Sequence, residues 1–155
     1  MSVREPDRAT DSEFPRPDSR LPAPDSRFPV PAGWPRGSGY SHAVVAQGRA
    51  IYTSGQIGWD PTSLTLAEGG LVAQTRRALE NVVAVLASAG ATPADLVRLT
   101  WFVTDRDAYI AARQAIGDTY RDVIGRYFPA MSVIFVSALL EPGAVVEIEA
   151  TAVVS

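Results

Sequence analysis

Two glutamates separated by a single residue are the first candidates for chemistry in this sequence. Glu147 and Glu149 lie in residues 145–154, where apolar and polar side chains alternate. This alternation predicts a β-strand whose neighbouring side chains point to opposite faces, so both carboxylates share one face. A carboxylate beside a pocket can activate water or transfer a proton. The same pattern also fits the polar, exposed face of an ordinary strand.

The residue types that are absent exclude several kinds of catalysis. The 155 residues include no cysteine and no lysine, all 14 basic residues are arginines, and the single histidine is His42. Thiolate nucleophiles, Schiff-base lysines and Cys- or His-rich metal sites are therefore excluded. Carboxylates, hydroxyls, tyrosines, arginines and backbone amides remain, and we expect neither a cofactor nor a metal.

Length and composition indicate one globular domain. The chain is 46% hydrophobic and 20% charged, which is ordinary for a globular protein with its own core. A formal net charge of −3 favours no nucleic-acid partner, which would require a basic face. No leader-like or membrane-spanning apolar run occurs, so we expect a cytoplasmic protein with no membrane partner.

Residues 1–33 differ from the rest of the chain. They hold seven of the 12 prolines and a repeating heptapeptide that brings Phe14, Leu21 and Phe28 to matching positions. Frequent prolines prevent helices and central strands. We expect this segment either to be a disordered tail or to dock along a neighbouring surface, and residues 34–155 to form the domain.

The pattern from residue 34 onward predicts an α+β fold. Two strands at 44–46 and 50–54 are expected to form a hairpin. The elements that follow are expected to be a helix at 72–89, a strand at 96–104, a helix from 105–107 to 124, and strands at 131–136 and 145–154. A mixed sheet with two helices on one face is the simplest way to bury these apolar faces.

Four short blocks of sequence occur together in this chain. They are Tyr-Ser-His-Ala at 40–43, Tyr-Thr-Ser-Gly-Gln-Ile-Gly at 52–58, Phe-Pro-Ala-Met-Ser at 128–132 and Val-Glu-Ile-Glu-Ala at 146–150. In combination they resemble the RidA/YjgF family of imine and enamine deaminases, over residues 36–155. The resemblance implies a chorismate-mutase-like α+β fold that assembles as a homotrimer, with small-molecule pockets between subunits.

The resemblance also implies roles for single residues. Glu147 matches the glutamate that holds the hydrolytic water, and Tyr40 matches a tyrosine that lines the pocket, so these two are the predicted catalytic residues. Ser54 and Gly55 match a serine and a glycine that place a hydroxyl and backbone groups beside the ligand. Small residues at such positions let backbone amides approach a ligand closely.

Several residues depart from the deaminase pattern. Met131 stands where the deaminases have an arginine that binds the substrate carboxylate, Val133 where they often have a cysteine, and Gly117 where they have an asparagine. Trp59 follows Ile57 and Gly58 where a proline is frequent. We expect these residues to line the substrate pocket, together with Phe128.

The change from arginine to Met131 affects the expected substrate. An arginine–carboxylate contact consists of charged hydrogen bonds worth about 1.5–3 kcal/mol each. Methionine supplies none and offers an adaptable apolar wall instead. We therefore expect weak binding of simple 2-imino acids and a preference for neutral or cationic ligands. An arginine from elsewhere would change this, with Arg36 and the tail residues Arg16, Arg20 and Arg27 as candidates.

Three functions are compatible with these residues. The first is a RidA-like enzyme that acts on an imine or enamine more hydrophobic than a simple 2-imino acid. The second is a non-catalytic trimeric metabolite-binding protein that uses the same pocket. The third is the endoribonuclease activity sometimes ascribed to the family, which the acidic charge does not favour.

Overall fold

One long strand lies at the centre of the sheet. In the computed structural model, which describes residues 27–155, β7 (Val146–Val154) pairs antiparallel with β1 (Arg49–Tyr52) and β2 (Gln56–Ile57) on one side. On its other side it pairs antiparallel with β5 (Leu96–Val103), and β6 (Ala130–Phe135) runs parallel to β5 at the edge of the sheet. The sheet is therefore mixed, as predicted.

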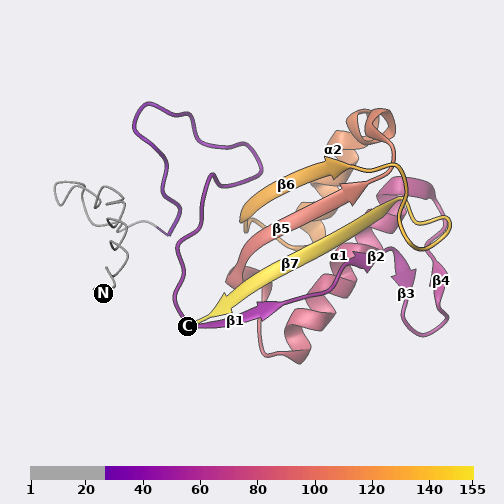
Figure 1. The fold of residues 1–155 in the computed structure, drawn as a ribbon, viewed down its shortest axis with the longest axis horizontal. Coiled ribbons are helices and arrows are strands. Elements are labelled where there is room, and N and C mark those ends of the chain that lie inside the picture. Colours follow the sequence, from indigo (N-terminus) through magenta and orange to yellow (C-terminus); the bar gives the residue numbers. More distant parts are fainter. Residues whose placement is uncertain (1–26) are drawn as a thin grey trace, which may run out of the picture.

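Two helices cover one face of this sheet. α1 (Gly70–Ser88) and α2 (Arg106–Val123) lie side by side behind the strands in Figure 1. Alternate residues of the central strands are buried against them, among them Leu99, Val103, Val146 and Ile148. Each large apolar side chain buried in this way contributes about 1.5–3 kcal/mol. The predicted α+β fold with two helices on one face is confirmed.

The helix ends follow from local sequence. The side chain of Asp105 accepts a hydrogen bond of 2.9 Å from the backbone N–H of Ala108, which satisfies one of the free amides in the first turn of α2. α1 ends before Gly90, whose φ of +76° favours glycine. The predicted helices at 72–89 and 105–124 are correct to within two residues.

The predicted hairpin between residues 44–46 and 50–54 is wrong. Residues 44–46 form no strand, and the N–H of Val45 donates to the carbonyl of Arg27 at 2.8 Å. β1 pairs instead with the far end of β7, where Ala50 lies opposite Val153. β7 is nine residues long and can pair with β1 and β2 in succession, so a long-range pairing replaces the local one.

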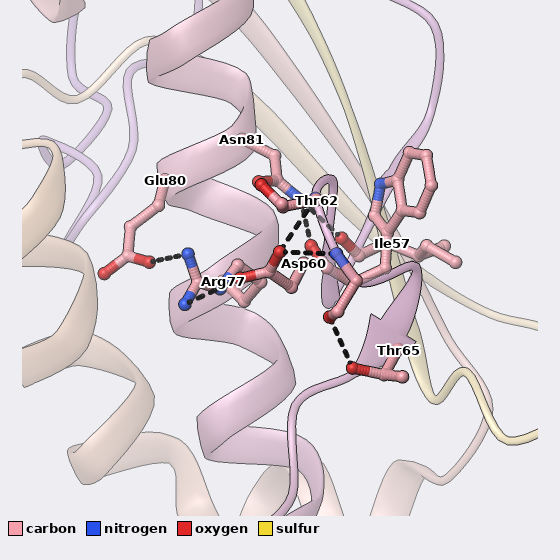
Figure 2. Close-up of polar contacts among 9 residues, drawn as sticks. Ile57, Asp60, Thr62, Thr65, Arg77, Glu80 and Asn81 are labelled. Atoms are coloured by element: carbon pink, nitrogen blue, oxygen red, sulfur yellow. Dashed lines mark hydrogen bonds and ion pairs between the residues drawn. The ribbon is translucent and has the colours of Figure 1, made fainter.

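A small hairpin lies between β2 and α1. β3 (Trp59–Asp60) and β4 (Thr65–Leu66) pair with each other, and Figure 2 shows the turn between them. Backbone N–H groups of Ser63 and Thr62 donate to the carboxylate of Asp60 and hold its pKa below the ordinary value. Leu64 adopts a φ of +59°, which an L-residue adopts at some cost in energy.

A segment without regular structure crosses the start of β6. The backbone N–H of Ser41 donates to the carbonyl of Pro129, and its hydroxyl donates to the carbonyl of Phe128. These bonds hold the chain around Tyr40 beside the start of β6. The prediction for the tail falls mostly on residues 1–26, including Phe14 and Leu21, which lie outside the described residues.

A buried amide fixes the new hairpin to α1. The side chain of Asn81 donates to the carbonyl of Ile57 at 3.1 Å and to that of Trp59 at 2.8 Å (Figure 2). Buried carbonyls of this kind are costly to leave without a donor. Asn81 therefore determines where β2 ends and β3 begins.

Replacing Asn81 by alanine is expected to lower the free energy of unfolding by about 1–3 kcal/mol, because two carbonyls lose their donor. Urea unfolding followed by circular dichroism measures this difference. The control is Gln114→Ala on α2, where the exposed amide contacts only Asp118 among residues 27–155, and where a change below about 0.5 kcal/mol is expected. Equal losses in the two variants would contradict the role of Asn81.

Candidate functional site

The predicted site residues lie in two separate cavities of the protomer. The first, called the Met131 cavity below, is lined by five of them: Tyr40, Gly117, Phe128, Met131 and Val133. The second, called the Glu147 cavity, is lined by the other four: Ser54, Gly55, Trp59 and Glu147. The two cavities share no lining residue, so one chain does not bring the two predicted catalytic residues into a single cavity.

The Met131 cavity has a volume of about 270 Å³ and lies between α2 and the edge strand β6. Met131 and Val133 pair with Leu99 and Trp101 of β5, so they belong to the side of the sheet that the helices cover. Both pack against the core and are only partly buried. This cavity is an apolar recess at the end of the core.

Aromatic rings form much of the wall of the Met131 cavity. Tyr120 and Phe128 stack with ring centroids 5.7 Å apart, and the hydroxyl of Tyr120 donates to the carbonyl of Tyr127. Burial raises the pKa of Tyr120 far above its ordinary value. Burial also raises the pKa of Tyr109, and the charge of Arg113 offsets part of that rise. Both phenols are therefore neutral hydrogen-bonding groups near neutral pH.

Two arginines that the sequence analysis did not single out also line the Met131 cavity. Arg113 and Arg121 come from α2, four residues before and after Gly117. Residues four apart lie on one face of a helix, so this spacing was a signal that could have found them. Met131 carries no charge, but these two arginines place cations in the wall of the same cavity.

The arginines that had been considered as replacements lie elsewhere. Arg36 lines a neighbouring cavity that shares Tyr40 and Phe128 with the Met131 cavity. Arg27 donates to the carbonyl of Ala94 at 2.8 Å, on another part of the protomer. Arg16 and Arg20 lie outside the described residues.

The Glu147 cavity has a volume of about 530 Å³ and lies beside β2 and the β3–β4 hairpin. Glu147 is opposite Ile57 across the β2–β7 pairing, on the face away from the helices, and is half-buried. Its carboxylate lies directly over Gly55, because a side-chain carbon at Gly55 would overlap the carboxylate. Glycine at this position therefore makes room for the glutamate. Glu149, two residues on, is exposed.

The surroundings of Glu147 are mainly apolar. Ile57, Leu64, Leu66 and Leu140 line the same cavity, with Trp59 and the second carboxylate Glu141. Leu140 is 97% exposed, so its side chain is free to contact a ligand or another chain. The side-chain amide of Gln56 donates to the hydroxyl of Ser54 at 3.1 Å and orients it.

α1 fixes both walls of the Glu147 cavity. Gly58 packs so closely on the backbone of Gln74 that a larger residue at position 58 would clash with it. The buried side chain of Gln74 donates to the carbonyl of Gly143 at 3.0 Å and accepts from the N–H of Val145 at 3.0 Å. Gln74 thus holds the loop before β7, and Asn81 holds the opposite wall.

The single histidine has a packing role. The ring of His42 contacts Trp34 and Tyr40 edge-on, with centroids 5.4 and 5.5 Å apart, and its Nε2 lies 2.9 Å from the carbonyl of Pro35. These contacts support the ring of Tyr40. Within residues 27–155, no cluster of three metal-ligating side chains and no helix suited to crossing a bilayer is found.

Comparisons with known proteins agree with this architecture. A family model described as Endoribonuclease L-PSP matches residues 35–154. A protein named DfrA from Myxococcus xanthus is 42% identical over 121 residues, covering 74% of this chain and 84% of that protein. The 2-iminobutanoate/2-iminopropanoate deaminase of Capra hircus is 39% identical over 114 residues, covering 74% of this chain and 79% of the deaminase.

A solved structure is also similar. The YyfB protein of Yersinia pestis, described as a protein of unknown function of the conserved Rid family, superposes with a TM-score of 0.67 at 40% identity. The match covers 75% of this chain and 87% of YyfB. The fold and the matches define a small α+β protein of the Rid type. The chain belongs to the Endoribonuclease L-PSP family, that is, to the RidA/YjgF family, as the resemblance predicted.

The buried phenol of Tyr120 makes stability depend on pH in the alkaline range. In the unfolded chain a tyrosine loses its proton near pH 10, whereas burial keeps Tyr120 protonated in the folded chain. The buried, protonated phenol therefore adds its full share to the free energy of unfolding below pH 10, and this share is lost as the pH rises above that value. Tyr120→Phe is expected to reduce stability by about 1 kcal/mol at pH 8, through the lost hydrogen bond, and by less at pH 11.

Urea unfolding of wild type and Tyr120→Phe from pH 8 to 11 measures how the difference in stability between them shrinks. Tyr127→Phe is the matched control, because the Tyr127 side chain is 51% exposed and the substitution keeps the backbone carbonyl that bonds to Tyr120, so the pH dependence of stability should be unchanged. Parallel curves for wild type and Tyr120→Phe would contradict the assignment.

Proposed function

We propose that the protein hydrolyses an imine, or the imine tautomer of an enamine, with Glu147 as the group that activates water. The observation that supports this most directly is the position of the Glu147 carboxylate over Gly55, in an open and mainly apolar cavity. The relative from Capra hircus is named as a deaminase of two small imino acids, which supports the same reaction class.

In the proposed mechanism, Glu147 accepts a proton from water as the oxygen attacks the carbon of the C=N bond. The resulting amino alcohol receives a proton on nitrogen and releases ammonia, which leaves a carbonyl product. One water is consumed and one ammonia is formed for each imine. The hydroxyl of Ser54 and backbone groups near Gly55 would position the substrate, because donors fixed in advance stabilise developing charge.

We also propose that the complete site forms between subunits of a homotrimer. Tyr40 and Glu147 belong to cavities that share no residue in one protomer, so a site that uses both needs a second chain. The helix-free face of the sheet carries exposed apolar side chains, including Tyr52 and Ile134. Apolar surface of this kind is typical of interfaces.

The substrate is proposed to be bulkier than a simple 2-imino acid. Met131 supplies no charged hydrogen bond at the position where the deaminases have an arginine, and its neighbours Val133 and Phe128 are apolar. Such walls favour a hydrophobic substituent. A non-catalytic metabolite-binding trimer is the alternative outcome of the experiments below.

Glu147→Gln is expected to lower ammonia release from a panel of enzymatically generated imines by at least about 100-fold, because the amide cannot accept the proton of water. Glu149→Gln is the matched control, since Glu149 is exposed on the same strand, and it should retain most of the activity. Equal activity of wild type and Glu147→Gln would exclude the proposed mechanism. Binding without any ammonia release would favour the metabolite-binding protein.

The same panel tests the role of Met131. Met131→Arg is expected to increase turnover of simple 2-imino acids, because it restores charged hydrogen bonds worth about 1.5–3 kcal/mol each. A variant that binds these substrates no better than wild type would show that more than one residue accounts for the specificity.

Subunit complementation is expected if the site is shared between chains. Tyr40→Ala and Glu147→Gln should each be inactive alone, and mixed trimers should recover about a quarter of the wild-type activity, because random mixing leaves that share of interfaces intact. Refolding equal amounts of the two variants together, followed by the ammonia assay, measures the recovery. Mixed samples without activity would contradict a site shared in this way.

A further inference from the structure

A row of residues on α2 forms one wall of the Met131 cavity. Tyr109, Arg113, Gly117 and Arg121 follow one another at intervals of four and all line the cavity. Four residues advance about 6 Å along a helix, so the two arginines stand on either side of Gly117 on one face. The wall that faces Met131 therefore carries positive charge, although Met131 itself carries none.

The two arginines differ in how their charge is used. Arg121 forms a salt bridge with Asp118, one turn before it on the same helix. Arg113 is exposed and makes no hydrogen bond or salt bridge with any residue of the described range 27–155, and its charge acts on the phenol of Tyr109. Arg113 is thus the cation of this wall that is available to a ligand.

Gly117 keeps the space between the arginines open. Glycine inside a helix costs about 1 kcal/mol relative to alanine. Nothing in the local geometry requires glycine, because an added carbon at position 117 would meet only Nη1 of Arg121, at 3.6 Å. A residue without a side chain leaves room for a ligand group to reach the guanidinium groups.

A buried aromatic ring forms another part of the wall of the Met131 cavity. Trp101 lines the Met131 cavity from β5 and is 2% exposed. Its indole N–H has no hydrogen-bond partner within the described part of the chain. This N–H is itself buried and exposes almost no surface to the cavity, so Trp101 would meet a ligand through its ring. Phe128 and Tyr120 also line the cavity, and their rings stack on each other.

We propose that the Met131 cavity binds an organic anion with an apolar, ring-sized body, and that Arg113 determines this specificity. The inference rests on the proposed function and specifies its substrate class. The substrate is an imine or enamine whose charged group is separated from the C=N carbon by a spacer. The anion contacts the helix wall at Arg113, opposite the strand position that Met131 occupies. The expectation of neutral or cationic ligands is replaced by this one.

The spacer follows from the positions of the two walls. In a 2-imino acid the carboxylate is attached directly to the C=N carbon, so both groups must be bound at adjacent points. Arg113 belongs to the helix layer and Met131 to the sheet layer, with the cavity of about 270 Å³ between them. That volume is at the lower end for small-molecule sites. It suits a single ring with a short chain.

Direct binding to the full-length protein tests this inference without requiring turnover. The probes are 3-phenylpropanoate, its neutral amide and pyruvate, followed by calorimetry and by the assigned indole N–H signals in NMR. Wild type is expected to bind 3-phenylpropanoate about 10- to 100-fold more tightly than the amide, as expected for one or two charged hydrogen bonds. Binding should shift the signal of Trp101 and leave that of Trp34, which lies outside this cavity, unchanged.

Arg113→Gln should abolish the preference for the anion over the amide, and Arg113→Lys should retain part of it. Arg106→Gln is the matched control, because Arg106 is exposed in the first turn of the same helix and pairs with Asp107. It should behave like wild type. An unchanged preference in Arg113→Gln would overturn the inference. Pyruvate has no spacer between its carboxylate and its carbonyl carbon. If it binds as tightly as 3-phenylpropanoate and depends equally on Arg113, the inference that the ligand needs a spacer is wrong.

The experiments distinguish failure of the anion site from failure of the proposed imine hydrolysis. Arg113-dependent binding of the aryl anion without ammonia release from any imine would support the anion site and overturn the hydrolase. Ammonia release that falls by the same factor for anionic and neutral imines in Arg113→Gln would support the hydrolase and overturn the anion site.

Discussion

The pairing of β7 with three other strands is the constraint on which the rest of the structure depends. Its buried residues, such as Ile148, face the two helices and form the centre of the core. Its other face carries Glu147 opposite Ile57 of β2. A shift of one residue in this register would move the glutamate into the core and the apolar residues onto the open face. Core formation and the position of the carboxylate therefore depend on the same hydrogen bonds.

Two buried side-chain amides on α1 fix the backbone around the cavity beside Glu147. Gln74 holds the loop that precedes β7, and Asn81 holds the carbonyls of Ile57 and Trp59. They are seven residues apart, so they lie on one face of the helix and hold opposite walls. Because each amide bonds to backbone atoms, the walls are positioned by groups that do not vary with the side chains of the loops. Leu64, Leu66 and Leu140 line the same cavity without taking part in these bonds.

The two halves of the predicted site have different physical characters. The half around Glu147 is a carboxylate within apolar side chains, and the half around Met131 is an aromatic recess with arginines on its helix wall. Reading Met131 alone suggested that the recess had lost its cation. The periodicity of α2 shows why that was incomplete, since a helix brings residues four apart to one wall, and the arginines of this wall do not depend on the residue at position 131. Charge in a cavity depends on every element that lines it.

The sequence by itself determined both helices, the strands β5, β6 and β7, and the family. Alternation along 145–154, the helical spacing of 106–123 and the cap at Asp105 are local patterns, and each reports the conformation of its own segment. Tertiary structure alone decided that β1 pairs with β7 rather than with residues 44–46, that Tyr40 and Glu147 line different cavities, and that the wall of α2 with Arg113 faces Met131 across one cavity. These features depend on contacts between segments far apart in the chain. Local periodicity carries no information about which of the available partners gives the best-packed sheet.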